Sequence, residues 1–548
     1  KNATKDAAIT LQMRDKRRVF YGVNVTGSMK NAEIVLSYQD KEVVSKNIDV
    51  DPAHPFTAIW TAKEDIDEYG LKLSFRDEEG KEVLSYTPYK RELPPLPETL
   101  EDFKPVGEID NVEDLYLTGR WVEQFSRPYL DPDDYYLKAL EISPTDYRVN
   151  MALGIRRVKQ WRFAEAEEHL EKAALKLKYQ YIQPEEGDLY YYWALAQRAQ
   201  GKKQEAFRNF SYAAYHYAWY SAANYQLAQM ESEEGNIGQA LDYIDDAYST
   251  NNRDAKIVVL YSALLRKAGR GEEALAMLDK ALDFDPLNYA LLYEKELVTG
   301  RPIVGAMNDN MQDVENNYIE IAINYLNAGI YDEAVKLFSR IKDPANPLFL
   351  YYHAYALANS GQDSLARSIV ASADHKSFDY VFPYRLESEK VLKYAAKVDT
   401  TSAFPSYLLG NLLYDNRPAE AIAAWNKAAK INGGSPMVWR NLAFGAFHHQ
   451  KNPEKAIEYL TKALNDSPDH PYWYSELAEY YAASDRDPRE CLAMLDSHIE
   501  IVKRDVTAPK DLVNLYNLTG EYDKAIELLA THHFRTWEGG REIYWYYV

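Results

Sequence analysis

The spacing of apolar residues changes once along the chain and divides it into two regions. In residues 1–93 apolar and polar residues alternate, as in Val19, Tyr21 and Val23, which is the period of a half-buried strand. From about residue 146 onward the apolar positions recur every three or four residues, which is the period of an amphipathic helix. The pattern therefore predicts a β domain followed by a long helical region.

The alternating region contains short strands separated by turn residues. Asp77–Gly80 forms a predicted hairpin loop between two of them. About seven short strands in some ninety residues are typical of an immunoglobulin-like sandwich. The Cys…Trp…Cys pattern of antibody domains is absent, since the only cysteine is Cys491. The strands are expected near Ile9–Met13, Val19–Val25, Glu33–Tyr38, Val43–Val50, Phe56–Thr61, Leu71–Arg76 and Glu82–Tyr86.

The helical region repeats with a period of about 34 residues. In each repeat a small residue lies twelve positions before an alanine, and a large apolar residue lies four positions after that alanine. Examples are Ala194, Ala206 and Phe210, then Ala228, Ala240 and Ile244, then Ser262, Ala274 and Leu278. Small residues at two fixed points let paired helices cross closely. This is the tetratricopeptide signature, so we expect a mainly α protein in which a right-handed α-solenoid follows a small immunoglobulin-like β-sandwich.

The pattern also predicts domain boundaries and two interruptions of the repeat. Proline residues in the segment Leu93–Pro97 make a stiff linker. The predicted segments are the sandwich (1–93), a Pro-rich linker with a helical cap (94–145), repeats (146–374) with an insert (289–314), an inserted helical segment (375–405), and repeats with an aromatic tail (406–548).

Composition excludes several classes of protein. The net charge is −21, from 84 acidic and 63 basic side chains, which disfavours nucleic acid as a partner. The densest basic run is Arg156–Arg162, and acidic residues follow it closely, so we expect an ordinary solvated helix face. A single cysteine excludes an internal disulfide and a CxxC metal site. The sequence contains no run of 18 apolar residues, so it predicts no membrane-spanning helix.

The region from about 88 to 540 resembles a bacterial family of tetratricopeptide proteins. The stretches that carry the resemblance are YYLKALEISPTDYRVNMALG (135–154), FRNFSYAAYHYAWYSAANYQLA (207–228), VFPYRLES (381–388), YLLGNLLYDNRPAEAIAAWNKA (407–428) and WEGG (537–540). Members of that family carry, upstream, a galactose-mutarotase-like domain of unknown function, and no such domain is present in this chain. The resemblance implies a carbohydrate-related context and supplies no catalytic residue. The chain begins Lys1-Asn2 with no apolar signal region, and we interpret it as a fragment or a processed chain.

No motif for catalysis, cofactors or metals is found. A phosphate loop, a GxSxG elbow, an HExxH motif and an EF-hand loop are all absent. The acidic runs Asp131–Asp134 and Glu185–Asp188 could favour a metal, but acids in a first helical turn also complement the helix dipole. The histidine pairs 448–449 and 532–533 point about 100° apart in a helix and are interpreted as surface residues. We expect no catalytic residue, no cofactor and no metal.

Aromatic residues in the repeats are the strongest candidates for a ligand-binding site. The repeat frame places several of them on or near the concave face, where stacked rings could hold a sugar or a peptide side chain. The alternative is that the rings only pack adjacent helices. The candidates are Tyr191, Trp219, Tyr220, Tyr225, Gln229, Tyr351 and Tyr355. In the second insert, Arg385 and Glu387 could contact a ligand or form an ion pair that holds the extra helix.

Two functional hypotheses from different classes follow. The first is a non-catalytic scaffold that binds a protein or peptide segment on the concave face, with the missing upstream domain as one candidate partner. The second is the accessory, glycan-binding half of a carbohydrate-processing enzyme whose catalytic domain lies upstream. Under either hypothesis this chain itself is not expected to be an enzyme. The location stays open, with the bacterial periplasm or secretion as candidates.

Overall fold

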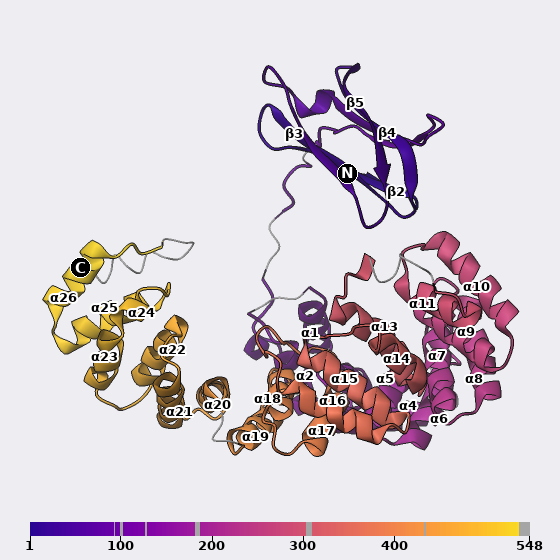
Figure 1. Cartoon of the computed structure of the whole chain (residues 1–548). Helices are drawn as coiled ribbons and strands as arrows, with labels where there is room; N and C mark the ends of the chain where they lie inside the picture. Colours follow the sequence, from indigo (N-terminus) through magenta and orange to yellow (C-terminus); the bar gives the residue numbers. More distant parts are fainter. Residues whose placement is uncertain are drawn as a thin grey trace. The chain divides into compact units, whose positions relative to one another are not determined.

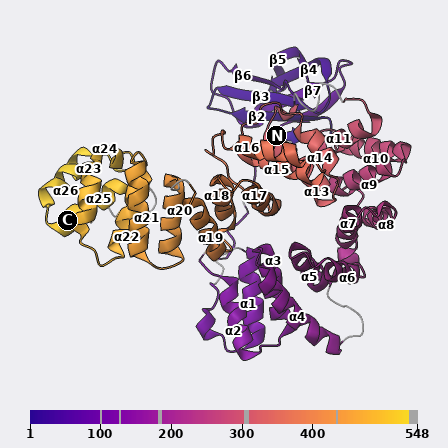
Figure 2. The same cartoon turned by 60° about the horizontal axis from the view of Figure 1, so that its bottom comes forward.

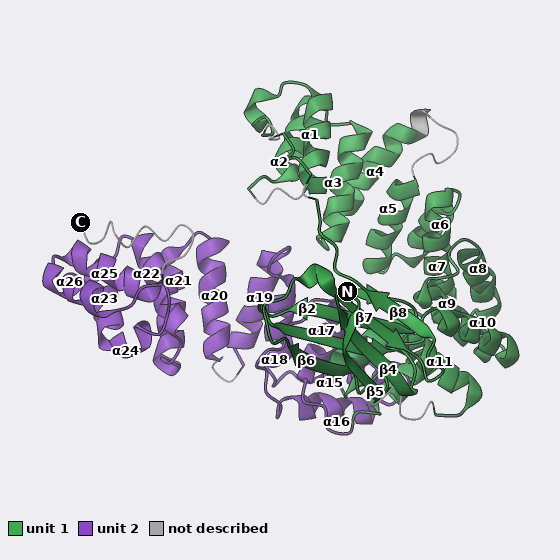
Figure 3. Ribbon diagram, turned by 90° about the horizontal axis from the view of Figure 1, so that it is seen from above, with its two compact units in different colours: residues 1–341 green, residues 342–548 purple. Residues whose placement is uncertain are grey.

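The chain folds into two compact units, residues 1–341 and 342–548 (Figure 3). The computed structural model describes residues 1–92, 94–98, 102–125, 129–180, 187–302, 310–431 and 435–535. The aromatic tail and the WEGG stretch (537–540) lie outside the described residues.

Unit 1 begins with a sandwich of two antiparallel four-stranded sheets (Figure 1). The strand orders are β1-β2-β3-β6 and β5-β4-β7-β8. The predicted alternation places Val19, Val23 and Ile34 in the core, each at most 3% exposed. The strands are β1 (Asn2–Ala3), β2 (Ala7–Met13), β3 (Arg18–Val25), β4 (Met29–Tyr38), β5 (Lys41–Val50), β6 (Phe56–Thr61), β7 (Leu71–Arg76) and β8 (Glu82–Tyr86).

Helices in consecutive pairs make up the rest of unit 1 (Figure 2). Within each pair a short turn reverses the chain, and the pairs stack on their neighbours in sequence order. The helices are α1 (Val112–Phe125), α2 (Pro132–Ile142), α3 (Tyr147–Lys159), α4 (Phe163–Gln180), α5 (Gly187–Ala199), α6 (Lys203–Ala213), α7 (Tyr217–Glu233), α8 (Ile237–Thr250), α9 (Ala255–Lys267), α10 (Gly271–Phe284), α11 (Tyr289–Thr299), α13 (Glu315–Asn327) and α14 (Tyr331–Phe338).

Small residues allow the two helices of each pair to cross closely. Ala206, Ala240 and Ala274 are fully buried at these crossings, as the spacing predicts. At Gly154 an added Cβ would lie 2.5 Å from Leu170 Cγ, so only glycine fits there. Close crossing brings large apolar side chains together and buries a continuous core.

Unit 2 continues the paired arrangement with two helices outside the pairs: α17, between the pairs α15–α16 and α18–α19, and the short α24, between α23 and α25. Cys491 is fully buried among apolar residues, so it is a structural thiol. The helices are α15 (Pro347–Asn359), α16 (Asp363–Ala373), α17 (Glu387–Val398), α18 (Phe404–Leu413), α19 (Pro418–Ala429), α20 (Pro436–His448), α21 (Pro453–Asp466), α22 (Pro471–Ala482), α23 (Pro488–Ser497), α24 (Ile499–Val502), α25 (Ala508–Thr519) and α26 (Tyr522–Thr531).

The predicted fold class is confirmed. The chain is mainly helical, its helices pair and stack as a solenoid, and a small β-sandwich precedes them. Each predicted strand is present within a few residues of its expected bounds. The first insert contains α11, and the second contains α17.

Candidate functional site

First helices of several neighbouring pairs contact one another. In unit 1 these contacts join α3 to α5, α5 to α7, and α9 to both α11 and α13; in unit 2 they join α22 to α25. We call this surface the first-helix face. In a stack of repeats it is the continuous surface that a partner can contact.

Four rings pack together where α5, α6 and α7 meet. Tyr191 stacks on Trp219 with ring centroids 4.5 Å apart, and it lies edge-on to Phe210 at 5.6 Å. Tyr192 lies edge-on to both Tyr191 and Trp219. Burial raises the pKa of Tyr191 to about 12. These rings therefore fill the space between helices, as the packing alternative predicts, and their role as ligand contacts stays a prediction.

Arg198, at the end of α5, connects two of the other candidates. Its guanidinium donates to Gln226 Oε1 at 2.6 Å and to Gln229 Oε1 at 2.9 Å, both on α7. Gln229 is 4% exposed. Burial raises the pKa of the nearby Tyr225, and the neighbouring charge of Asp254 adds to the shift. The structure thus brings Tyr225 and Gln229 together around a cation that the sequence analysis did not single out.

The turn between α13 and α14 packs against this part of the first-helix face. Arg198 donates to the carbonyl of Asn327 at 3.0 Å, and Ser232 Oγ donates to the carbonyl of Ala328 at 2.8 Å. At Gly329 an added Cβ would lie 2.9 Å from the Cα of Glu233. A segment of the chain itself therefore covers the face at the ends of α5 and α7. No local pattern signals this contact, since its partners lie 96 and 129 residues apart.

The remaining candidate tyrosines lie apart from that cluster. Tyr220 faces the second helix of its own pair, and its hydrogen bond to Asp246 raises its pKa. In unit 2, Tyr351 is fully buried, and burial raises its pKa. Tyr355 is half-buried, lies edge-on to Tyr394 at 5.8 Å, and has Lys390 Nζ 5.7 Å from its ring centroid.

The insert before α17 exposes a row of aromatic rings. Tyr380, Phe382 and Tyr384 are 91%, 71% and 59% exposed. Arg385 is buried, and its guanidinium lies 4.1 Å from the ring centroid of Tyr384. Glu387 is the first residue of α17 and is half-buried. The ligand role and the ion-pair role of Arg385 and Glu387 both stay predictions.

A buried ionic cluster joins α9, α11, α13 and α14. Arg266 donates to Glu294 at 2.8 Å and to Glu333 at 3.1 Å. Glu294 is fully buried and also accepts a hydrogen bond from Tyr325 at 2.7 Å. Burial raises the pKa of Glu294, while the Arg266 pairing opposes the shift. Each oxygen of Glu294 has a partner on another helix, so the cluster holds α13 and α14 in place.

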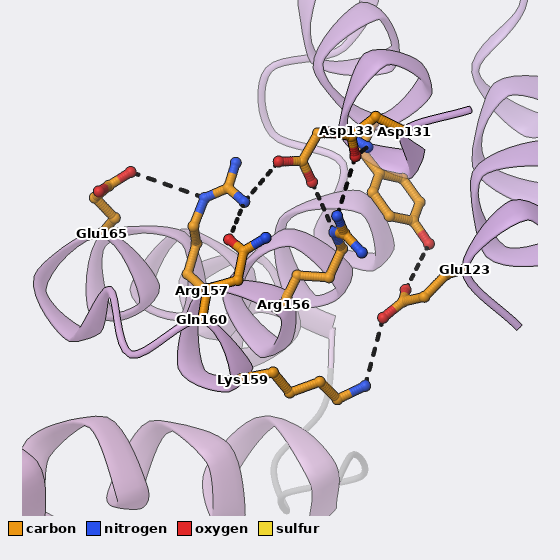
Figure 4. Close-up of polar contacts among 9 residues, drawn as sticks. Glu123, Asp131, Asp133, Arg156, Arg157, Lys159, Gln160 and Glu165 are labelled. Carbon is orange, nitrogen blue, oxygen red and sulfur yellow. Dashed lines mark hydrogen bonds and ion pairs between the residues drawn. The ribbon is translucent and has the colours of Figure 1, made fainter. Parts of the chain in front are cut away.

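The basic run on α3 is neutralised within the fold (Figure 4). Arg156 donates to Asp133 at 2.7 Å and to Asp131 at 3.0 Å, and Arg157 pairs with Asp133 at 2.7 Å. Arg157 is 5% exposed, so the expectation of a solvated helix face is wrong for this residue. Asp131 caps α2 by accepting from the backbone of Asp133, which is the helix-terminus role considered for it. Sequence alone did not reveal the network because its acids and bases lie on different helices.

Unit 2 carries a row of polar pairs across successive first helices. Asn441 on α20 donates to Asn411 on α18 at 2.8 Å. Arg440 on α20 donates to Glu476 on α22, with Nε to Oε2 at 2.9 Å. Ser475 on α22 donates to Asp511 on α25 at 2.6 Å. Each of these hydrogen bonds connects the first helix of one repeat to the first helix of the next. The paired side chains belong to the first-helix face.

The described residues offer few features of other kinds of site. Among the described residues, no group of three or more His, Cys, Asp or Glu side chains is placed to hold a metal ion. Within the same residues, no helix has both the length and the apolar character needed to cross a membrane. A depression of about 530 Å³ lies on the sandwich beside Ala8, Gly22 and Phe56, and small side chains line much of it.

Two known families match parts of the chain. Residues 2–86 match the family described as the second domain of YphG-like protein. Residues 407–471 match a tetratricopeptide repeat family. The upstream galactose-mutarotase-like domain implied by the sequence resemblance has no counterpart in these matches.

Solved structures similar to this chain include a tetratricopeptide repeat protein and chains of two complexes. A tetratricopeptide repeat protein from Parabacteroides merdae is 17% identical, with 55% of this chain and 98% of that chain covered and a TM-score of 0.27. A chain of the Naa15/Naa10 complex bound to HypK-THB is 13% identical, with 76% and 68% covered and a TM-score of 0.26. A chain of the APC/C hetero-tetramer Cut9-Hcn1 is 14% identical, with 74% and 96% covered and a TM-score of 0.24.

Proposed function

We propose that this protein is a non-catalytic scaffold that binds a segment of a partner protein on its first-helix face. The main support is the solenoid itself. Each repeat contacts only its neighbours for most of its length, so the first helices offer one long surface whose side chains can vary without loss of the fold. Buried charges of unit 1 are paired within the fold, as Arg157 is with Asp133 and Arg266 is with Glu294.

We place the binding site on the unit 2 part of this face. At the ends of α5 and α7 in unit 1, the α13–α14 turn already covers the face. In unit 2 the first helices α20 and α22 leave Met437 and Tyr472 exposed at 41% and 55%. Exposed Met and Tyr beside satisfied polar pairs are typical of binding surfaces, because they supply contact area at low cost in solvation.

Partner capture with the full chain tests this proposal. Bound proteins are identified by mass spectrometry, and capture is then repeated with Tyr472→Ala and Tyr225→Ala. We expect a partner that is lost with Tyr472→Ala and retained with Tyr225→Ala. Glu458→Ala, an exposed position on the second helix α21, is the control and should retain it. If every captured partner survives both tyrosine substitutions, the first-helix face is not the binding surface.

We also propose a second function for testing, a glycan-binding accessory role. The exposed row Tyr380, Phe382 and Tyr384 favours it, since aromatic faces stack on sugar rings. The enzyme it would assist is the upstream carbohydrate-related domain that the sequence resemblance implies. A glycan array with the full chain and with Phe382→Ala tests this role. Binding that Phe382→Ala abolishes supports it, and an array without any signal rejects it.

A further inference from the structure

We propose that the first-helix face of α20, α22 and α25 binds a basic segment of the partner, one that presents Lys or Arg beside an apolar residue. This inference rests on the proposed scaffold function and adds the chemistry of the partner. It comes from the side chains that these three helices place together.

One stripe of α22 lies along this face, exposed at Tyr472 and buried at Glu476 and Tyr480. Tyr472, Glu476 and Tyr480 follow each other at intervals of four residues, so they lie on the same side of the helix. Glu479, seven residues after Tyr472, borders this stripe. Tyr472 is 55% exposed, and Glu479 is exposed as well. An exposed aromatic ring and an exposed carboxylate are therefore available on this helix, about two turns apart.

Negative charge is in excess on this face. Arg440 is paired with Glu476, so these two charges offset each other. Lys510, the other cation of these helices near the site, is 7% exposed. Glu479 forms no ion pair within the part of the chain that is described. Asp505 and Asp511 add two more carboxylates from the start of α25 and the turn before it.

Asp511 lies close enough to two of these carboxylates for their charges to act on its ionisation. Burial, with the charges of Asp505 and Glu479 adding to its effect, raises the pKa of Asp511 to about 6, while the hydrogen bond from Ser475 and the charge of Lys510 oppose the shift. A bound ammonium or guanidinium group would lie close to these carboxylates and would stabilise their ionised forms. An acidic segment would meet repulsion from the same groups.

An unsatisfied hydroxyl is a second and independent indication of a ligand. Tyr480 is fully buried, and its Oη has no hydrogen-bond partner among the described residues. Burial raises the pKa of this hydroxyl, the charges of Glu476 and Glu479 add to the shift, and the charge of Arg440 opposes it. Buried polar groups in folded proteins are nearly always paired, so a hydroxyl left without a partner is a candidate to bond an incoming group.

The test must separate a local site from the general attraction of a protein with net charge −21. Three labelled twelve-residue peptides serve as probes: alternating Lys and Leu, the same with Gln for Lys, and the same with Glu for Lys. Their binding to the full chain is measured by fluorescence anisotropy in 150 mM salt. Glu479→Lys is compared with Glu458→Lys, because both residues are exposed glutamates of unit 2 and both changes alter the net charge equally.

We expect only the Lys peptide to bind. Glu479→Lys should weaken it on the order of tenfold, whereas Glu458→Lys should change it by less than about twofold, since long-range attraction alone is screened at this salt concentration. Circular dichroism checks that both variants fold, and Glu479→Gln gives a milder change that should weaken binding less. Equal losses with the two lysine variants, or equal binding of the three peptides, would overturn the inference.

Failure of this inference is distinguishable from failure of the scaffold proposal. Suppose that a captured partner is lost with Tyr472→Ala and that cross-linking maps its contact to an acidic segment. This result contradicts the basic-segment inference but not the scaffold proposal. Capture that no first-helix substitution affects contradicts both.

Discussion

At the scale of single residues, the small side chains between paired helices determine how closely those helices approach. Ala274 on α10 is fully buried, whereas Ala276 on the same helix is exposed. We expect Ala274→Leu to overpack the crossing and to lower the free energy of unfolding by about 1–3 kcal/mol. Ala276→Leu is the matched control and should change it little. Thermal unfolding measures both, and equal midpoints would show that the crossing tolerates the larger side chain.

A buried histidine should make unit 2 sensitive to acid. Burial lowers the pKa of His353 on α15 to about 4. Since the folded-state pKa lies below the unfolded value of about 6.5, the neutral form stabilises the fold above that pH. This contribution, about 3 kcal/mol, is lost as the pH falls from 6.5 to 4.

The experiment compares His353→Gln with the wild type across this pH range. We expect the wild type to lose more stability than the variant between pH 6.5 and pH 4, as measured by urea unfolding. His375→Gln, at an exposed position of the same unit, should follow the wild type. Parallel pH profiles for the wild type and His353→Gln would contradict the prediction.

Residue positions that follow from local spacing could be predicted, and those set by distant partners could not. Ala206, Ala240 and Ala274 were predictable because the repeat fixes their distance from the crossing. Arg157 was not, because Asp133 neutralises it from a different helix. The same limit applies to the candidate tyrosines, since spacing placed Tyr225 near the first-helix face but gave no sign of Arg198 beside it.

At the scale of elements, glycines in the turns between helices serve two different purposes. Gly269 has a φ of +77° and no atom within 4 Å of an added Cβ, so it is needed only for its backbone conformation. Gly329 has a φ of +70° and also lies against the backbone of Glu233. The sequence shows both as turn glycines, and only the fold shows which one lies in a contact.

This difference can be measured with matched substitutions. Gly269→Ala should cost about 1–2 kcal/mol, the penalty for a left-handed conformation. Gly329→Ala should cost roughly 1–3 kcal/mol more, because the added methyl must displace the α13–α14 turn from α7. Thermal unfolding gives the two costs. A similar loss in both variants would mean that the turn is not held closely.

At the scale of the whole molecule, charge determines the class of partner. The 84 acidic side chains outnumber the 63 basic ones, and the main basic run is bound to acids of its own unit. Duplex DNA should therefore bind negligibly even at low ionic strength, where attraction would be strongest. An anisotropy titration checks this, and micromolar binding that weakens with added salt would contradict it.

The contact between the α13–α14 turn and α5 and α7 also has a mechanical consequence. A solenoid whose repeats touch only their neighbours can extend like a spring, since stretching it breaks no contact between distant repeats. Here Arg198 and Ser232 bond to carbonyls 129 and 96 residues further along the chain. Those bonds must break before the segment between them can lengthen. Under tension, this part of unit 1 should resist extension until those bonds break and should then lengthen in a single step, rather than stretch gradually.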